Sequence, residues 1–354
     1  MEPAGRISEE LRIKNVKIDV KDKRILALLA ENARIPLSQI AKKVQLSRDA
    51  IDYRIKRLQR EGVIIRFFPV IDLKRFGYYI FHVFFLIDEM NRDKQVELLD
   101  FLKNHPHIRN IIEYSDRWDL EISIIAHDID EFDEISQGIT QRFPQLILEK
   151  ENMQIIKGYH SIHLPKSIQH EINHVSLPQE ERFAQVRLDE IDLAILRELA
   201  KNCRTSPFEI AKLVDLTGDA INYRIRRMLE SGVIRYFTIL TNLSALGFHW
   251  YTFSMQMKTF TSEFDRKLKE YVSQHHYIIR AVKTLGVWDL MLYVVADSPK
   301  HFHSTVKELK VVFSDVIRNH QTLLGYMEHR FDPLPAAVEI PNQERRHRAG
   351  PHEF

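Results

Sequence analysis

The pattern of hydrophobic and polar residues over residues 16–72 predicts a small helical module that ends in a strand. Apolar residues recur at helical spacing in three segments, residues 19–31, 37–44 and 48–60. In the third segment Ile51, Ile55 and Leu58 share one face, which we expect to be buried. The apolar run over residues 63–71 is typical of a strand. Together these elements predict a winged helix-turn-helix.

Residues 73–163 show a different pattern, in which strands alternate with amphipathic helices. The expected strands are residues 78–87, 108–115, 118–126 and 146–160, and the expected helices are residues 92–105 and 130–143. In the first of these helices, Val96, Leu99 and Leu102 are expected to point inward. The order strand-helix-strand-strand-helix-strand predicts a ferredoxin-like domain.

The whole pattern occurs twice in the chain. Residues 22–126 align with residues 192–296 without a gap, and "DAIDYRI" at 49–55 returns as "DAINYRI" at 219–225. Such self-similarity over a long stretch indicates a duplicated unit. The fold class is therefore expected to be α+β, with two tandem units. Each unit is a winged helix-turn-helix followed by a ferredoxin-like βαββαβ domain.

The repeat also sets the expected domain boundaries. They are residues 16–72 and 186–242 for the winged helix-turn-helix modules, 73–163 and 243–332 for the ferredoxin-like domains, 164–185 for a linker and 333–354 for a disordered tail. Near the end of each unit we expect a register slip of three residues. The slip aligns "KGYH" (157–160) with "LGYM" (324–327).

The outer face of the third helix carries basic and aromatic side chains in both units. A solvated amphipathic helix with snorkelling Lys and Arg would show one such face, but here the same residue types recur at the same helical positions. Because this helix enters the major groove in helix-turn-helix proteins, the repetition predicts contact with double-stranded DNA. The residues expected at the DNA are Ser47, Arg48, Asp49, Tyr53, Arg54, Lys56, Arg57 and Arg60 in the first unit, and Thr217, Asp219, Tyr223, Arg224, Arg226 and Arg227 in the second. Of these, Ser47 and Thr217 also fit the N-cap positions.

Composition narrows the classes of function. The formal net charge is only +2, so affinity for DNA must come from a local basic face. The single cysteine, Cys203, excludes an intrachain disulfide and a cysteine zinc cluster, and it favours the cytoplasm. It is expected to be a small packing residue rather than a redox sensor. The most apolar run, residues 67–87, is broken by charged residues, so no membrane span is predicted.

Further motifs predict no catalytic chemistry. The histidines at 105–107, 275–276 and 301–303 have no carboxylate or cysteine partner at ligand spacing, so neither a metal nor a cofactor is expected. The chain also has no glycine-rich phosphate loop and no nucleophile motif. We therefore expect a protein that is not an enzyme.

The combination of modules resembles the Lrp/AsnC family of transcriptional regulators. "LSRDAIDYRIKRLQREGVI" (46–64) is similar to that family's recognition helix and wing, and "EYSDRWDLEISIIA" (113–126) is similar to the hairpin of its effector domain. The resemblance implies sequence-specific DNA binding, modulation by a small effector such as an amino acid, and assembly into homo-oligomers through the ferredoxin-like domains. The effector residues that it implies are Asp116, Trp118, Asp119, Gly286, Trp288 and Asp289.

Two departures from the family pattern accompany this resemblance. Ordinary members carry one unit per chain and pair through their effector domains, so this chain resembles a fused dimer. Asp116 stands where the family's hairpin has glycine, and Val287 follows Gly286 where the family often has Asp. For Trp118 and Trp288 the alternative role is packing beneath the hairpin.

Two other functions remain open from the sequence. The chain also resembles siroheme decarboxylases, which use an Lrp/AsnC-like architecture, sometimes as fused tandem units. That resemblance implies an enzyme that acts on a tetrapyrrole. An architectural protein that binds DNA with little sequence preference would use the same basic faces.

Overall fold

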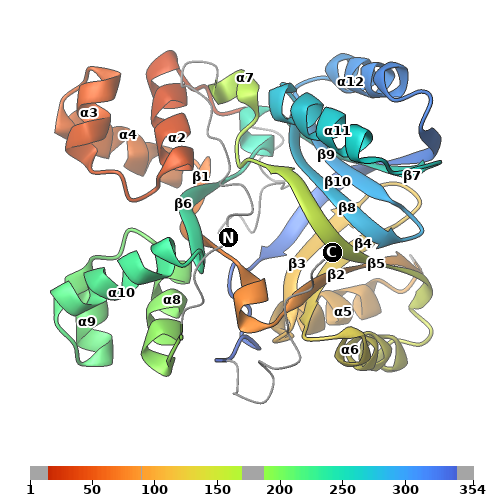
Figure 1. Ribbon diagram of the computed structural model, residues 1–354, viewed down its shortest axis with the longest axis horizontal. Helices are drawn as coiled ribbons and strands as arrows, with labels where there is room; N and C mark the ends of the chain where they lie inside the picture. Colours follow the sequence, from red (N-terminus) through yellow and green to blue (C-terminus); the bar gives the residue numbers. More distant parts are fainter. Residues whose placement is uncertain (1–14, 89, 170–186, 341–354) are drawn as a thin grey trace.

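Figure 1 shows the computed structural model, which describes residues 15–88, 90–169 and 187–340. The chain has the predicted α+β fold, with two successive units of the same organisation. The helix-turn-helix modules lie on one side of the molecule, and the strands and helices of the ferredoxin-like domains lie on the other.

The helix-turn-helix modules form where the hydrophobic spacing predicts them. Their elements are α2 (Val20–Glu31), α3 (Leu37–Val44), α4 (Arg48–Arg60) and β1 (Ile64–Ile71) in the first unit, and α8 (Glu190–Lys201), α9 (Pro207–Val214), α10 (Gly218–Glu230) and β6 (Ile234–Thr241) in the second. Ser47 and Thr217 are confirmed as N-caps, since each hydroxyl accepts the amide hydrogen three residues on. Ile51, Ile55 and Leu58 are buried as expected.

The ferredoxin-like domains follow in the predicted order. In the first unit the elements are η1 (Leu73–Phe76), β2 (Tyr79–Ile87), α5 (Arg92–Asn104), β3 (Ile108–Tyr114), β4 (Leu120–Ala126), α6 (Ile129–Arg142) and β5 (Ile147–Ser161). In the second unit they are η2 (Ser244–Leu246), β7 (His249–Met257), α11 (Ser262–Gln274), β8 (Ile278–Gly286), β9 (Leu290–Ala296), α12 (Pro299–Val312) and β10 (Ile317–Phe331). Within each unit the strands are antiparallel in the order second, third, first, fourth.

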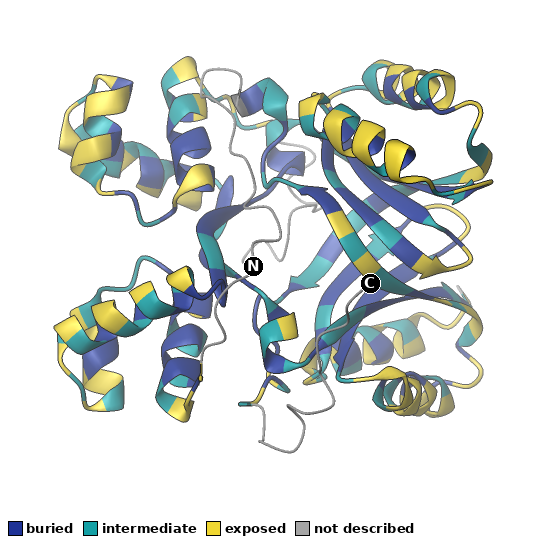
Figure 2. Cartoon of the chain, in the orientation of Figure 1, coloured by how far each residue is buried: buried dark blue, intermediate teal, exposed yellow. Residues whose placement is uncertain are grey.

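The sheets of the two units close on each other to form a single barrel. The last strand of the first unit, β5, pairs with β8, and the last strand of the second unit, β10, pairs with β3. Helices α5, α6, α11 and α12 cover the outside of the barrel with their apolar faces and expose their polar faces (Figure 2). A further buried cluster runs from both helix-turn-helix modules into the barrel.

A second junction between the units is the antiparallel ribbon of β1 and β6. The sequence predicts β1 as a wing strand, and the structure pairs it with the wing strand of the other unit. Reciprocal backbone hydrogen bonds flank the ribbon: Ala33 N–H donates to Phe237 at 3.0 Å, and Cys203 N–H donates to Phe67 at 2.9 Å. Each module is therefore tied to the other, and both are held at one ribbon.

The expected core face of α5 is partly wrong. Leu102 is buried and Leu99 is partly buried, but the side chain of Val96 is 56% exposed. The core face of α5 is set by Leu98 and Leu102, four residues apart. Position 96 lies about 200° around the helix from Leu98, so it faces outward.

The predicted register slip at the end of each unit is also wrong. Lys157 of β5 lies opposite Lys283, and Met327 of β10 lies opposite Glu113. Because Lys283 and Glu113 are themselves 170 positions apart, Lys157 corresponds to Met327 and not to Leu324. The two units therefore keep one constant offset through their last strands.

Parts of the expected linker and tail are ordered. A short helix, α7 (Lys166–Gln169), follows β5, and Leu164 and Ile168 are buried in the cluster that includes α2. Leu334 and Val338 are buried as well, so the tail does not begin at 333. The rest of the expected linker to 185, and the tail from 341, lie outside the described residues.

We predict that Gly286→Ala destabilises the barrel, whereas Gly158→Ala has little effect. Gly286 has φ +148° at the junction with β5, and an added Cβ would lie 2.7 Å from the Asn152 carbonyl oxygen. Such strain costs about 1–3 kcal/mol. At Gly158 a Cβ meets nothing within 4 Å. Urea unfolding of both variants measures the difference, and equal stabilities would contradict the prediction.

Candidate nucleic-acid interface

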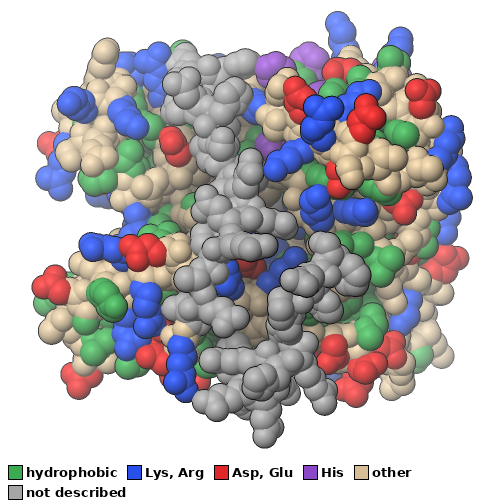
Figure 3. All heavy atoms as spheres, viewed as in Figure 1, with side chains coloured by type: hydrophobic (Ala, Val, Ile, Leu, Met, Phe, Trp, Pro, Cys, Tyr) green, Lys and Arg blue, Asp and Glu red, His purple; other side chains and the backbone are tan. Residues whose placement is uncertain are grey.

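The outer faces of α4 and α10 are open to solvent, as the sequence predicts. Tyr53 and Tyr223 are 62% and 65% exposed, which is unusual for large aromatic side chains. Arg48, Asp49, Lys56 and Arg60 are exposed on α4, and Asp219, Arg226 and Glu230 are exposed on α10. Figure 3 shows Lys and Arg side chains on both helix-turn-helix lobes, with a notch between the lobes.

Two arginines on α4 are held by α2 instead of being free on this face. Arg57 donates to the Asp22 carboxylate at 2.6 Å, and Arg54 donates to Asp22 and Asp19, both at 2.8 Å. The side chain of Asp22 is only 1% exposed, whereas each arginine is about a quarter exposed. Asp22 is therefore a buried anchor that fixes the recognition helix to the first helix of its module.

The second unit repeats this clamp. Arg224 donates to Asp189 at 2.9 Å and to Asp192 at 2.8 Å, and Arg227 donates to Asp192. Asp192 is fully buried. Arg54, Arg57, Arg224 and Arg227 were all expected at the DNA, and the structure shows that each is engaged in an ion pair within its own module.

The hydrogen bonds and ion pairs of the clamp lower the pKa of its outer carboxylate. Partial burial would raise the pKa of Asp19, but the Asp22 amide and the Arg54 guanidinium hydrogen-bond to the carboxylate and lower that pKa below its ordinary value. The pKa of Asp189 is lowered in the same way by Asp192 and Arg224. Asp19 and Asp189 are therefore charged at neutral pH, where they can pair with Arg54 and Arg224.

Sequence reasoning missed the aspartates of the clamp, although a signal for them was present. Asp22 and Asp192 coincide in the repeat, and each lies at the third position of its helix, where it completes a capping box. A capping role accounts for an acidic residue at that position. The arginines bonded to it lie 32 and 35 positions away, so only the fold brings them together.

The charged side chains on the exposed faces of α4 and α10 differ between the two units. On α4 the exposed face has three cations, Arg48, Lys56 and Arg60, against Asp49 and Asp52, and Lys56 pairs with Asp52 at 2.6 Å. The same positions on α10 are Gly218, Arg226 and Glu230, with Asp219 and Asn222. The first face thus has a net charge of about +1 and the second about −1, counted from these side chains at neutral pH.

The hairpin residues expected to bind an effector have structural partners. Asp119 accepts the Ile87 amide at 2.6 Å, and Asp289 accepts the Met257 amide at 2.7 Å, so both carboxylates tie strand ends together. Asp116 accepts the Leu324 amide at 2.8 Å across the junction with the other unit. These three carboxylates therefore make contacts that support the barrel.

Both hairpin tryptophans are buried. Trp118 is 2% exposed and Trp288 is 7% exposed, and both belong to the cluster inside the barrel. The packing role is the one that the structure supports. Gly286 lies against β5, where a side chain would clash.

Cys203 is fully buried beside the ribbon, and burial raises the pKa of its thiol to about 12. It is a packing residue, as expected. Within the described ranges, His, Cys, Asp and Glu side chains do not gather in groups of three or more that could hold a metal ion. Of the helices that the structure describes, none has the length and apolar character required to cross a bilayer.

Comparisons with known proteins find a helix-turn-helix domain in each unit. An AsnC-type helix-turn-helix domain matches residues 18–59, and a winged helix-turn-helix DNA-binding domain matches residues 188–235. An HTH-type transcriptional regulator of Mycobacterium tuberculosis is 30% identical over 149 residues, which are 42% of this chain and 98% of that protein. The leucine-responsive regulatory protein of Rhizobium meliloti is 33% identical over 127 residues, 35% of this chain and 80% of that protein.

The tandem arrangement has a counterpart among solved structures. The siroheme decarboxylase NirDL, in complex with an iron-uroporphyrin III analogue, matches with a TM-score of 0.60 and 11% identity. The match covers 92% of this chain and 97% of that chain. A second crystal structure of the siroheme decarboxylase NirDL gives a TM-score of 0.59 at 12% identity. At these identities the likeness shows a shared fold of two tandem units.

We predict that Asp22→Ala lowers the free energy of unfolding by about 3 kcal/mol. This is the lower end of the range for a broken buried ion pair, because Arg54 and Arg57 can still reach water. Asp192→Ala should cost a similar amount. Asp52→Ala is the control, since it removes only a surface pair worth at most about 1 kcal/mol. Chemical denaturation compares the three variants, and equal losses would show that the clamp is not a stabilising anchor.

Proposed function

Because the chain belongs to the Lrp/AsnC family of transcriptional regulators, we propose that it regulates transcription by binding specific double-stranded DNA through α4 and α10. The observation that carries the proposal is the duplicated, solvent-exposed outer face of these helices, with Tyr53 and Tyr223 at equivalent positions. Tyrosine can bond a phosphate or contact a thymine methyl group, and the exposed cations can reach phosphates or guanine edges.

The ribbon of β1 and β6 supports the use of both helices on one DNA molecule. It links the two modules through backbone hydrogen bonds, so a chain that binds one half-site presents the second helix at a high effective concentration. In family members with one unit per chain, two chains are needed to present two such helices. Here a single chain presents both, and association of whole chains is not required for two half-sites.

The unequal faces suggest an operator whose half-sites differ. The exposed charges on α4 are mainly basic, whereas those on α10 include Glu230 at the position of Arg60. The two helices would therefore contact different bases and neutralise different numbers of phosphates. A specific regulator should bind its operator at least about 10³-fold more tightly than random DNA at physiological salt, and a ratio near one would favour an architectural protein.

Modulation by an amino acid is the finer part of the proposal, and the name of the leucine-responsive relative supports it. The hairpin carboxylates expected to bind such an effector already have structural partners here. The proposal therefore does not assign the effector to these residues. Repeating the DNA-binding measurement with and without pooled amino acids tests for an effector. A reproducible change in affinity supports this part of the proposal, and no change removes it.

A second candidate function is a tetrapyrrole enzyme. The observation that favours it is the match of nearly the whole tandem chain to siroheme decarboxylase. Titration with siroheme, followed by absorbance and by analysis of the product, separates the two functions. Tight binding with loss of carboxylate groups would establish the enzyme, and unchanged siroheme would remove this candidate.

We predict that the two faces contribute unequally to the salt dependence of DNA binding. Lys56→Gln/Arg60→Gln should reduce the slope of log affinity against log salt by about 1.8, and Arg226→Gln by about 0.9, since each lost phosphate contact contributes about 0.9. The matched control is Lys307→Gln/Lys310→Gln on α12, at the outside of the barrel. Fluorescence anisotropy on a fragment selected from genomic DNA gives the slopes. Equal slopes in all three variants would contradict contact through these helices.

A further inference from the structure

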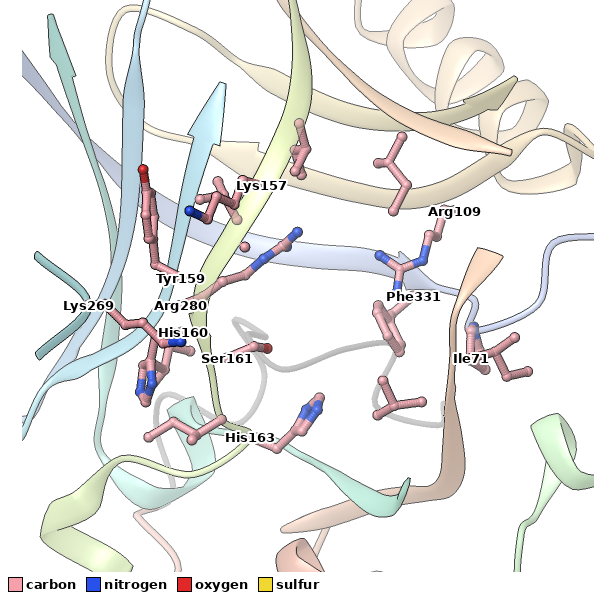
Figure 4. A pocket seen from close by; sticks show the side chains of 18 of the residues that line it. Ile71, Arg109, Lys157, Tyr159, His160, Ser161, His163, Lys269, Arg280 and Phe331 are labelled. Atoms are coloured by element: carbon pink, nitrogen blue, oxygen red, sulfur yellow. The ribbon is translucent and has the colours of Figure 1, made fainter. Parts of the chain in front are cut away.

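A cavity of about 680 Å³ lies between the β1–β6 ribbon and the barrel. Its walls come from both units: residues 68–71 of β1, residues 157–161 of β5, and parts of β8 and α11. Figure 4 shows Lys157, Arg280 and Arg109 reaching into one open space from β5, β8 and β3. The volume is that of a typical small-molecule site.

The polar lining of this central cavity is predominantly basic. Its cations among the described residues are Arg109, Lys157, Arg266, Lys269 and Arg280, and its carboxylate is Asp265. Asp265 is already bound, by Lys157 at 3.2 Å and by the Tyr159 hydroxyl at 2.6 Å. The described lining therefore carries more cations than carboxylates, and its net charge is positive.

The excess positive charge is not a requirement of the repeated scaffold. At the constant offset of 170, four of these cations have uncharged counterparts in the other unit. Lys157, Arg266, Lys269 and Arg280 correspond to Met327, Val96, Leu99 and Asn110. Both units fold alike with these different side chains, so the fold itself does not require a cation at these positions. Arg266 and Lys269 are also exposed, with no carboxylate partner among the described residues.

The remaining walls are apolar. Trp250, Phe331, Ile155 and Ile279 line the cavity between the cations. Burial lowers the pKa of His160, also in the wall, to about 4, so this imidazole is neutral at pH 7 and can accept or donate a hydrogen bond. Separated cations around an apolar space suit a ligand with several anionic groups on an apolar body.

We propose that the central cavity binds a small molecule that carries two or more carboxylate or phosphate groups on an apolar body. The site differs from the hairpin residues that the family resemblance implies. Where the chain acts as the proposed regulator, the ligand would also modulate DNA binding. Four consecutive residues of β1 form one wall, and β1 is half of the ribbon that positions both recognition helices. A ligand that favours one placement of this strand shifts the affinity for DNA.

The test uses the full chain and pyranine, a fluorescent pyrene with three sulfonates, as the probe. Fluorescence anisotropy should show saturable binding to the unmodified chain. Arg266→Gln/Lys269→Gln should weaken that binding at least 10-fold. Gly158→Leu should also weaken it by filling the space, because no atom lies within 4 Å of a Cβ at that position.

The controls locate the binding and identify the anion. Lys307→Gln/Lys310→Gln removes the same charge from α12, and Lys56→Gln/Arg60→Gln removes it from α4; both should bind pyranine as the unmodified chain does. Competition by benzene-1,3,5-tricarboxylate or by pyrophosphate shows whether carboxylates or phosphates are preferred. If pyranine does not bind, or binds all variants equally, the cavity is not an anion site.

DNA affinity, measured on the same variants without probe, separates this inference from the proposed function. Arg266→Gln/Lys269→Gln should bind the selected DNA fragment normally and lose only the effect of pyranine on that affinity. Pyranine binding with no DNA binding in any variant would overturn the proposed function and leave the anion site standing. Normal DNA binding that pyranine does not change would remove the regulatory coupling alone.

Discussion

The structure depends on strand edges that neither unit can satisfy alone. A ferredoxin-like sheet ends in two open edges, here β3 and β5 in the first unit and β8 and β10 in the second. Unpaired amide and carbonyl groups at such edges are costly when buried and promote aggregation when exposed. Pairing β5 with β8 and β10 with β3 removes all four edges, and pairing β1 with β6 covers one edge of each wing strand. Duplication within one chain makes these pairings intramolecular, so they need no second subunit.

The pairing of strands between the two units determines where the helix-turn-helix modules and the central cavity lie. The ribbon sets how the two helix-turn-helix modules are related, and the aspartate clamps set how each recognition helix sits within its module. Four arginines are used for that purpose, so the outer faces depend on fewer cations than a helical wheel suggests. The same closure creates the central cavity, whose walls belong to both units.

Most of the fold was predictable because local signals agreed with the global arrangement. Caps such as Ser47 and Thr217, and the apolar spacing of α4, fixed the helices to within a residue. The position of Val96 was predicted wrongly because the apolar residues of α5 are compatible with two different buried faces. Only packing against the sheet determines which of the two is buried. The predicted register slip was wrong because Gly-Tyr occurs in both segments at an offset of 167, whereas the paired strands keep the offset of 170. Leu334 and Val338 showed no periodicity by which their burial could be predicted.

The sites were less predictable than the fold, for a physical reason. Exposure of Tyr53 and Tyr223 follows from one helix, so sequence reasoning found it. The ion pairs of Arg54 and Arg57 join segments more than 30 positions apart, and a wheel cannot distinguish a free guanidinium from a clamped one. The central cavity combines β1, β3, β5, β8 and α11, so its charge excess becomes visible only when these elements are assembled.

The most direct measurement is a hydroxyl-radical footprint of the full chain on a genomic fragment that it selects. If one chain presents two linked recognition helices, the footprint should contain two short protected stretches of unlike sequence. Their centres should lie about 10–10.5 base pairs, or a multiple of that distance, apart, at one chain per site. A single protected stretch, or the same protection on a random fragment, would contradict the account.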